Sequence, residues 1–354
     1  MKMLINRPSF ILYFSLVTMP LFSIAQNGGG AEKKKTINKT YQVTANDKLD
    51  IENSFGDVVI STWDKNEIQV DIEIGAEAST DEKAQRILDD IVVNEEKIGN
   101  TITFKTDVGE INDHRNHKER GKDGNRTFHI DYTVHMPSGN PLDIENSFGR
   151  IKIGDLKGEV SLTSKFGGLT TGKLDNVDDI DVEFGEASIG QIHNGKITFK
   201  FNSKSHIAKV AGTAKINSEF SGNVQFTVDD NIEELTLNES YSTVKMIVSK
   251  ALSANFDIHT SFGSFSNNTD FNIKEDKDDE DDGPRFDKDY SGKIGNGNAK
   301  IKIKSSFGKV RLTTSDAKDQ MDEKQDQEER SEKAEKKERK EKKEKKEKKE
   351  KVDI

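Results

Sequence analysis

Short stretches of alternating apolar and polar residues recur along the middle of the chain. The clearest copy is LDIENSFGRIKI at 142–153, where Leu142, Ile144 and Phe148 lie on one side of the alternation. A two-residue period is typical of a strand with one buried face. The alternation breaks at Gly149 and then resumes. The pattern therefore predicts a strand, a corner and a second strand, with Phe148 on the inner face.

An aromatic residue ends each predicted first strand. The successive spacings of these anchors from Phe148 to Phe262 are 18, 18, 17, 19, 21 and 21, and one more anchor follows an insertion. The position four before each anchor is Ile or Leu. The position after it is Gly, Asn or Ser, residues that tolerate a positive φ or open a turn. The structural repeat anchors are Phe55, Phe148, Phe166, Phe184, Phe201, Phe220, Tyr241, Phe262 and Phe307.

Such a regular period is typical of a solenoid, in which each coil buries its inner face against its neighbours. We therefore predict an all-β fold, a β-helix-like β-solenoid of roughly 18–21-residue repeats over 142–314. The anchors would form a column of stacked rings. A β-sandwich of short strands is the alternative, because spacing alone does not separate the two folds.

Residues 39–141 predict a β-rich cap at the N-terminal end of the stack. A short helix begins near Ser79, which can cap it, with Glu82 completing a capping box. A hairpin over 91–104 and a strand over 128–136 follow. Terminal repeats are expected to be atypical, because a bare end would expose unpaired strand edges.

The two ends differ from the body. Residues 1–25 have a basic start, an apolar run and Ser23-Ile24-Ala25, which predicts a cleaved signal peptide; an uncleaved anchor helix is the alternative. Residues 26–38 read as a linker. Residues 315–354 are a low-complexity charged tail, either disordered or a single helix, and either a solvating spacer or a cationic arm. No second hydrophobic segment follows, so we expect an exported protein that is periplasmic, outer-membrane-associated or extracellular.

Charge and composition narrow the function classes. The 354 residues carry a net charge of −10. Residues 1–25 carry +2 and residues 316–354 balance, which leaves −12 for residues 26–315. An acidic body argues against nucleic-acid binding, which needs a concentrated basic face. The chain has no Cys, which excludes disulfide scaffolds and thiolate sites.

Candidate chemistry is sparse, and the sequence specifies no catalytic set and no cofactor. Within an acidic insertion at 272–292, four oxygen ligands partly follow the order of a calcium loop. They are Asp278, Glu280, Asp282 and Asp289. Position twelve of such a loop should be Glu, so we expect at most weak Ca²⁺ binding, with a plain excursion from the repeats as the alternative.

The stretch SFGDVVISTWDKNEIQVDIEI at 54–74, followed by further SFG-type repeats, resembles the bacterial β-strand-repeat putative adhesins of unknown function, exported proteins of Bacteroidetes-type organisms. The resemblance implies a β-solenoid-like fold and an envelope or surface role, and supplies no catalytic residues.

Three functions follow as hypotheses. The first is a non-enzymatic envelope or surface protein that binds a protein or polysaccharide partner along its strands. The second is a carbohydrate-active enzyme on a β-helix, with stacked carboxylates such as Glu145 with Glu183 or Asp143 with Asp181. The third is a periplasmic structural or regulatory module that binds a membrane protein.

Overall fold

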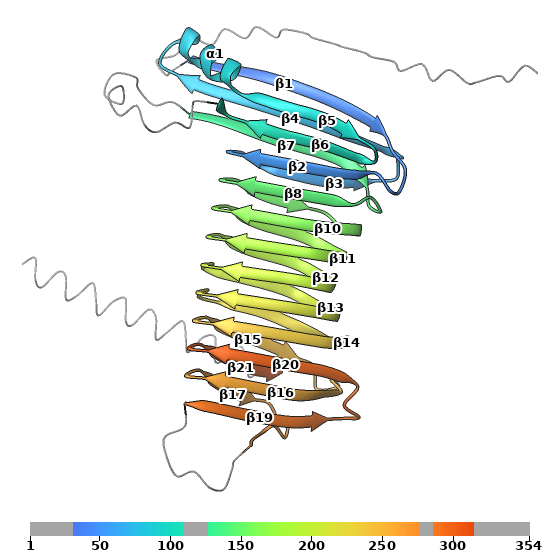
Figure 1. Ribbon diagram of the computed structural model, residues 1–354, viewed down its shortest axis with the longest axis vertical. Coiled ribbons are helices and arrows are strands. Elements are labelled where there is room, and N and C mark those ends of the chain that lie inside the picture. The colour runs from blue at the N-terminus through green and yellow to red at the C-terminus, as the bar shows by residue number, and fades with distance from the viewer. Residues whose placement is uncertain (1–30, 110–126, 277–285, 315–354) are drawn as a thin grey trace, which may run out of the picture.

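The computed structural model of the protein describes residues 31–109, 127–276 and 286–314, and these form a mostly β structure with one short helix (Figure 1). The strands join into one large mixed sheet that bends around corners. The elements are β1 (Ala31–Gln42), β2 (Lys48–Ser54), β3 (Val58–Trp63), β4 (Glu67–Ala78), α1 (Asp81–Asp90), β5 (Val92–Ile98), β6 (Thr101–Asp107), β7 (Thr127–Pro137), β8 (Leu142–Ser147), β9 (Arg150–Ile153), β10 (Leu156–Lys165), β11 (Gly168–Glu183), β12 (Glu186–Lys200), β13 (Lys204–Glu219), β14 (Val224–Ser240), β15 (Thr243–Val248), β16 (Ala254–Ser261), β17 (Ser264–Asn268), β18 (Lys274–Glu275), β19 (Asp287–Ile294), β20 (Ala299–Ser306) and β21 (Lys309–Thr314).

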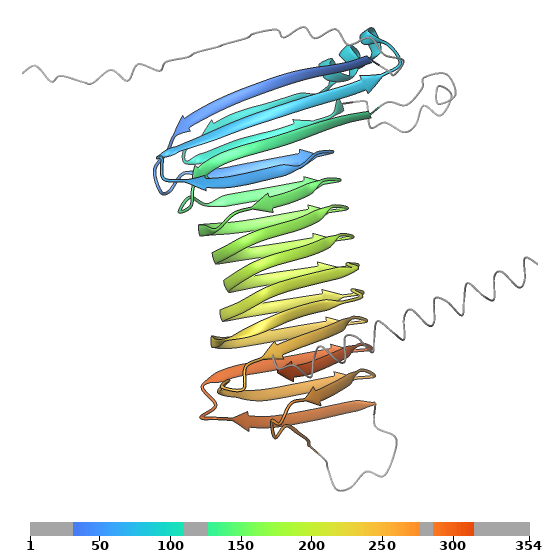
Figure 2. The same cartoon turned by 180° about the vertical axis from the view of Figure 1, so that it is seen from behind.

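Successive repeats pair in parallel, each displaced from the last by one repeat length. Ile144 of β8 pairs with Leu162 of β10, which pairs with Ile180 of β11. The strands after the corner do the same, since Ile151 of β9 pairs with Leu169 of β11. Figures 1 and 2 show the strands stacked in a column with α1 at one end and β19 at the other. Parallel pairing between repeats differs from the antiparallel sheets of the sandwich alternative.

The interior lies between the strands before the corner and those after it. The Ile or Leu four positions before each anchor is buried in every repeat, from Ile51 to Ile303. The glycine after an anchor has a different role from the one expected. It keeps a negative φ, but a Cβ on Gly167 would lie 1.8 Å from the carbonyl oxygen of Gly149. Close stacking of the corners therefore requires glycine at positions 149, 167 and 185, whereas Asn202, Ser221 and Ser242 stand at this place in later repeats.

The N-terminal block is a β-rich cap, with differences in detail from the expectation. The helix N-cap is Thr80, whose hydroxyl accepts a hydrogen bond from the Lys83 amide; it is not Ser79. The hairpin forms as β5 and β6. Strand β1 begins at Ala31, inside the expected linker, because it pairs along its whole length with β4.

The C-terminal strands occupy an unexpected place. The sequence order predicts that the repeat of Phe262 stacks directly on the repeat of Tyr241, with Phe307 last. Instead β20 pairs with β14 on one side and with β16 on the other. Likewise β21 lies between β15 and β17. The last repeat of the chain is therefore inserted between two earlier ones. Strand β19, which begins inside the expected insertion 272–292 and extends past it to Ile294, pairs in antiparallel fashion with β16.

Candidate binding surface

The anchor rings stack face to face along one edge of the column. Between consecutive members from Phe55 to Phe262 the ring centroids lie 4.8–5.2 Å apart with interplanar angles of 2–8°. We call this set the aromatic ladder. Its spatial order is Phe55, Phe148, Phe166, Phe184, Phe201, Phe220, Tyr241, Phe307 and Phe262.

The ladder lies outside the core, so the prediction that Phe148 faces inward is wrong. Phe148 is 53% exposed. The cause is its backbone: every anchor has a positive φ, between 50° and 64°, which turns the side chain out at the corner. A positive φ is uncommon for an aromatic residue. The inward alternation therefore ends earlier than expected, at the buried Asn146.

Two further rings extend the ladder, and sequence reasoning missed both. Phe128 packs against Phe55 at 5.0 Å with a tilt of 58°, and Phe286 stacks on Phe262 at 4.8 Å. Neither carries an SFG-type motif; Phe128 lies near the start of β7, and Phe286 directly precedes β19. A lone Phe at the start of a strand was the only available signal.

The stacking decides what the ladder can bind. Each inner ring has a neighbouring ring stacked on both of its faces, while about half of each side chain stays exposed. Stacking of a sugar or a nucleobase needs an open ring face. The ladder is thus a rigid apolar ridge between two sheet faces.

The first face is formed by the outward side chains of the strands that precede the corner. It is covered by ion pairs between neighbouring strands. Lys200 lies 3.1 Å from both Asp181 and Glu183, and these two carboxylates raise the pKa of its ammonium group. Lys48 lies 2.8 Å from Asp143 in the same way. On this face, lysines of one strand therefore pair with carboxylates of the neighbouring strand.

The carboxylates considered for catalysis do not stack as expected. In register, Glu145 and Asp181 both pair with Thr163, so Glu145 aligns with Asp181 and not with Glu183. Asp143 likewise aligns with Asp179, through Ser161. Lysines hold Asp143 and Asp181, so at least one carboxylate of each aligned pair is engaged in an ion pair.

The second face is formed by the outward side chains of the strands that follow the corner. It runs without interruption along β3, β9, β11, β12, β13, β14, β15, β21 and β17, which pair in parallel. Its side chains are mostly small hydroxyls and amides with basic residues among them. Thr170 and Ser188 are examples of the first kind, and Lys204 and Lys309 of the second; all four are exposed.

One carboxyl group is buried inside the column. Glu239 is 3% exposed and takes the place that serine or asparagine has in neighbouring repeats. Its Oε1 accepts a hydrogen bond from the Ser242 amide at 2.6 Å, and its other oxygen accepts one from the Ser305 hydroxyl. Burial outweighs these bonds and raises the pKa of Glu239. Its carboxylate fills the space beside Gly308.

Of the four calcium candidates, Asp278, Glu280 and Asp282 lie outside the described residues. Asp289 lies on β19, where its carboxylate is 2.7 Å from Nδ1 of His259. No group of three or more His, Asp or Glu suited to a metal ion occurs within residues 31–109, 127–276 and 286–314. Weak Ca²⁺ binding by the acidic insertion stays a prediction.

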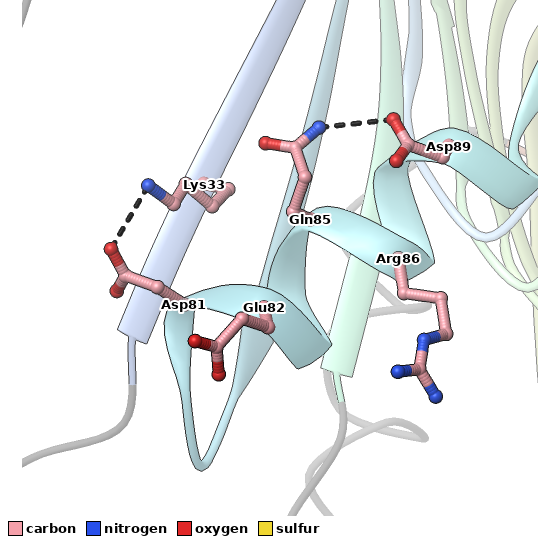
Figure 3. Close-up of a pocket in the computed structure, with 6 residues that line it drawn as sticks. All are labelled: Lys33, Asp81, Glu82, Gln85, Arg86 and Asp89. Atoms are coloured by element: carbon pink, nitrogen blue, oxygen red, sulfur yellow. Dashed lines mark hydrogen bonds and ion pairs between the residues drawn. The ribbon is translucent and has the colours of Figure 1, made fainter.

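A hollow of about 440 Å³ lies beside α1 (Figure 3). Lys33 and Asp81 pair across it at 3.0 Å, and Gln85 donates a hydrogen bond to Asp89 at 3.0 Å. Figure 3 shows these side chains on the outer surface of the helix and on β1. Four of the six side chains that line the hollow therefore pair with one another. Across the described part of the chain, no helix is long and apolar enough to span a bilayer.

Comparison with known proteins finds similarity only among solved structures; no family model and no curated protein matches the sequence. A structure titled a putative adhesin from Bacteroides fragilis aligns with a TM-score of 0.40 at 12% identity, covering 79% of this chain and 97% of that one. A putative adhesin from Parabacteroides merdae aligns with a TM-score of 0.30 at 10% identity, covering 78% and 96%.

A structure titled a putative lipid binding protein from Parabacteroides distasonis aligns with a TM-score of 0.31 at 13% identity, over 78% of this chain and 96% of that one. The resemblance to putative adhesins that the repeats predict is thus found again among solved structures.

Proposed function

We propose that the protein is a β-solenoid of the cell envelope that binds a partner along its flat sheet faces and catalyses no reaction. Parallel pairing of each repeat with the next supports the solenoid interpretation. The observation that carries the binding role is the second face. It offers one uninterrupted surface of in-register strands, with exposed polar side chains at a regular spacing.

The distribution of charged groups supports a binding role over an enzymatic one. Three of the first-face carboxylates considered as acid and base, Asp143, Asp181 and Glu183, each pair with a lysine. Four of the six side chains that line the hollow at α1 pair with one another. A partner that lies along a row of strands needs neither a pocket nor a perturbed group, and repeat proteins commonly bind over such extended surfaces.

The location of the protein tests this role. Intact cells are treated with a protease and then fractionated, and an antibody against the chain follows its loss, with a periplasmic protein as the control. We expect cleavage of this protein while the periplasmic control stays intact. Recovery of the uncut chain only from the periplasm would reject an adhesin-like role at the surface.

A further inference from the structure

In the folded protein, acidic residues are concentrated on the first face and the second face carries mostly basic ones. The first face contains twelve acidic and seven basic residues, counted over the segments 140–147, 158–165, 176–183, 193–200, 212–219, 233–240, 254–261 and 299–306. The second-face segments 149–154, 167–172, 185–190, 202–208, 221–228, 242–248, 263–268 and 308–314 contain one acidic residue, Glu186, and six basic ones. These are Arg150, Lys152, Lys204, Lys245, Lys309 and Arg311. Just before β3 of the same face, Asp57 pairs with Arg150 at 3.0 Å.

Three of these six basic residues, Lys245, Lys309 and Arg311, lie at the end of the face away from the cap. Lys245 of β15 pairs in register with Arg311 of β21, and with Gln225 of β14 on its other side. Lys309 lies between Thr243 and Ser264. Lys204 of β13, farther along the same face, pairs in register with Glu186 of β12. Because adjacent strands are about 4.8 Å apart, the basic side chains lie in rows at multiples of that spacing along the column.

Neutral hydrogen-bonding side chains fill the positions between the charges. Gln225 follows His206 in register, and Ser266 follows Arg311. Hydroxyl and amide groups both donate and accept hydrogen bonds, so they suit a ligand that carries hydroxyls beside its anionic groups. The rows of charge attract a polymer whose negative groups recur along its length.

We propose that the second face, from Lys204 on β13 to Ser266 on β17, binds an anionic polysaccharide. The ligand lies along the column, its acidic groups on Lys204, Lys245, Lys309 and Arg311 and its hydroxyls on the neutral side chains between them. The proposal rests on the binding role proposed above and names the face and the chemistry of the partner. It also revises the expectation from net charge, because a polymer contacts one face and not the average of the molecule.

Two other polyanions fit the face less well. Single-stranded nucleic acid gains much of its affinity by stacking bases on open aromatic rings. The aromatic ladder beside the face has its ring faces covered, as the 4.8–5.2 Å centroid distances show. The tail of the same chain carries equal numbers of acidic and basic groups over 316–354, so as a whole it brings no net negative charge to the face.

Calorimetric titration of the full chain, lacking only the predicted signal peptide, tests the proposal. The probe is dextran sulfate, and unmodified dextran and single-stranded DNA of matched length are run beside it at 0.1 M salt. We expect binding of dextran sulfate, none of dextran and weaker binding of DNA. The variant Lys204→Gln, Lys245→Gln, Lys309→Gln should bind dextran sulfate about tenfold more weakly, because three surface charge contacts are lost.

The matched control removes three lysines from the other face of the same column. Lys300, Lys302 and Lys304 alternate with buried residues on β20 and are exposed. Their substitution by Gln lowers the net charge equally and should leave affinity within about twofold of the parent. Thermal unfolding of both variants checks that they fold.

Equal weakening by the two triple variants would show attraction to overall charge and overturn the proposal. Tighter binding of DNA than of dextran sulfate would assign the face to nucleic acid. Failure of the full chain to bind dextran sulfate would also overturn it. The surface role remains separately testable, because protease accessibility on cells does not depend on this affinity.

Discussion

At the scale of the residue, the corner geometry shows what a sequence pattern can conceal. The phrase SFG suggests that glycine takes the positive φ, since glycine does so at little cost. In this protein the aromatic residue takes it, and Gly149, Gly167 and Gly185 are needed for the close approach of one corner to the next. Stacking between repeats offsets the unfavourable backbone of each ring. A single repeat contains no such information, so the sequence could locate the ladder but not its outward direction.

Replacement of one ladder ring tests that balance. Phe184 stacks on Phe166 at 4.9 Å and on Phe201 at 4.8 Å. Phe184→Ala should lower the free energy of unfolding by about 1–3 kcal/mol, because two aromatic contacts of about 0.5–1.5 kcal/mol each are lost. Phe184→Tyr should be close to neutral, since Tyr241 occupies the equivalent place. Urea unfolding measures both, and a loss below about 0.5 kcal/mol for the alanine variant would show that stacking contributes little.

The buried carboxyl group of Glu239 predicts a pH dependence. Burial raises the pKa of Glu239 in the folded protein, so the folded state holds the proton more tightly than the unfolded chain. The stabilisation from this group is therefore full below the unfolded pKa of about 4.3 and is lost as the pH rises through the folded pKa. Glu239→Gln should raise the unfolding temperature at pH 7, and the gain should shrink toward pH 4.

The exposed Glu233 on the same strand supplies the control. Glu233→Gln removes one negative charge without removing a buried one. If both variants shift the unfolding temperature equally at every pH, net charge and not burial is the cause.

At the scale of the element, the repeats could be predicted and their final order could not. The Ile or Leu four positions before each anchor reports the buried position reliably, because a narrow core accepts little else there. The spacing from Tyr241 to Phe262 fits direct stacking as well as it fits an inserted strand. The choice depends on the hairpin-like return of β19, which brings β20 back to the gap between β14 and β16.

Truncation before β20 distinguishes these orders. A chain that ends at Asn298 loses the strands that join β16 and β17 to the rest of the column. Hydrogen exchange should then show loss of protection over 254–268, while β10–β13 keep theirs, because pairing between repeats is local. Continued protection of 254–268 would mean that β16, still paired with β19, is held without β20.

At the scale of the whole molecule, two opposed faces share one thin body. Sheets pack about 10 Å apart, so the acidic first face lies close behind the basic second face. A net charge of −10 therefore acts on any polyanion that approaches from a distance. At contact, the nearer face decides the sign of the interaction. The range over which each effect holds is set by the ionic strength.

This arrangement predicts an unusual response to salt. The screening length is about 30 Å at 0.01 M, about 10 Å at 0.1 M and about 3 Å at 1 M. At 0.01 M a bound polyanion interacts with both faces, and the acidic one repels it. At 0.1 M that repulsion is largely screened while contacts on the second face persist, and at 1 M these weaken too. Affinity for dextran sulfate should therefore be highest near 0.1 M, whereas a uniformly basic protein binds less tightly at every increase in salt. Titrations at the three salt concentrations measure this, and a steady fall from 0.01 M would show that the acidic face exerts no influence through the column.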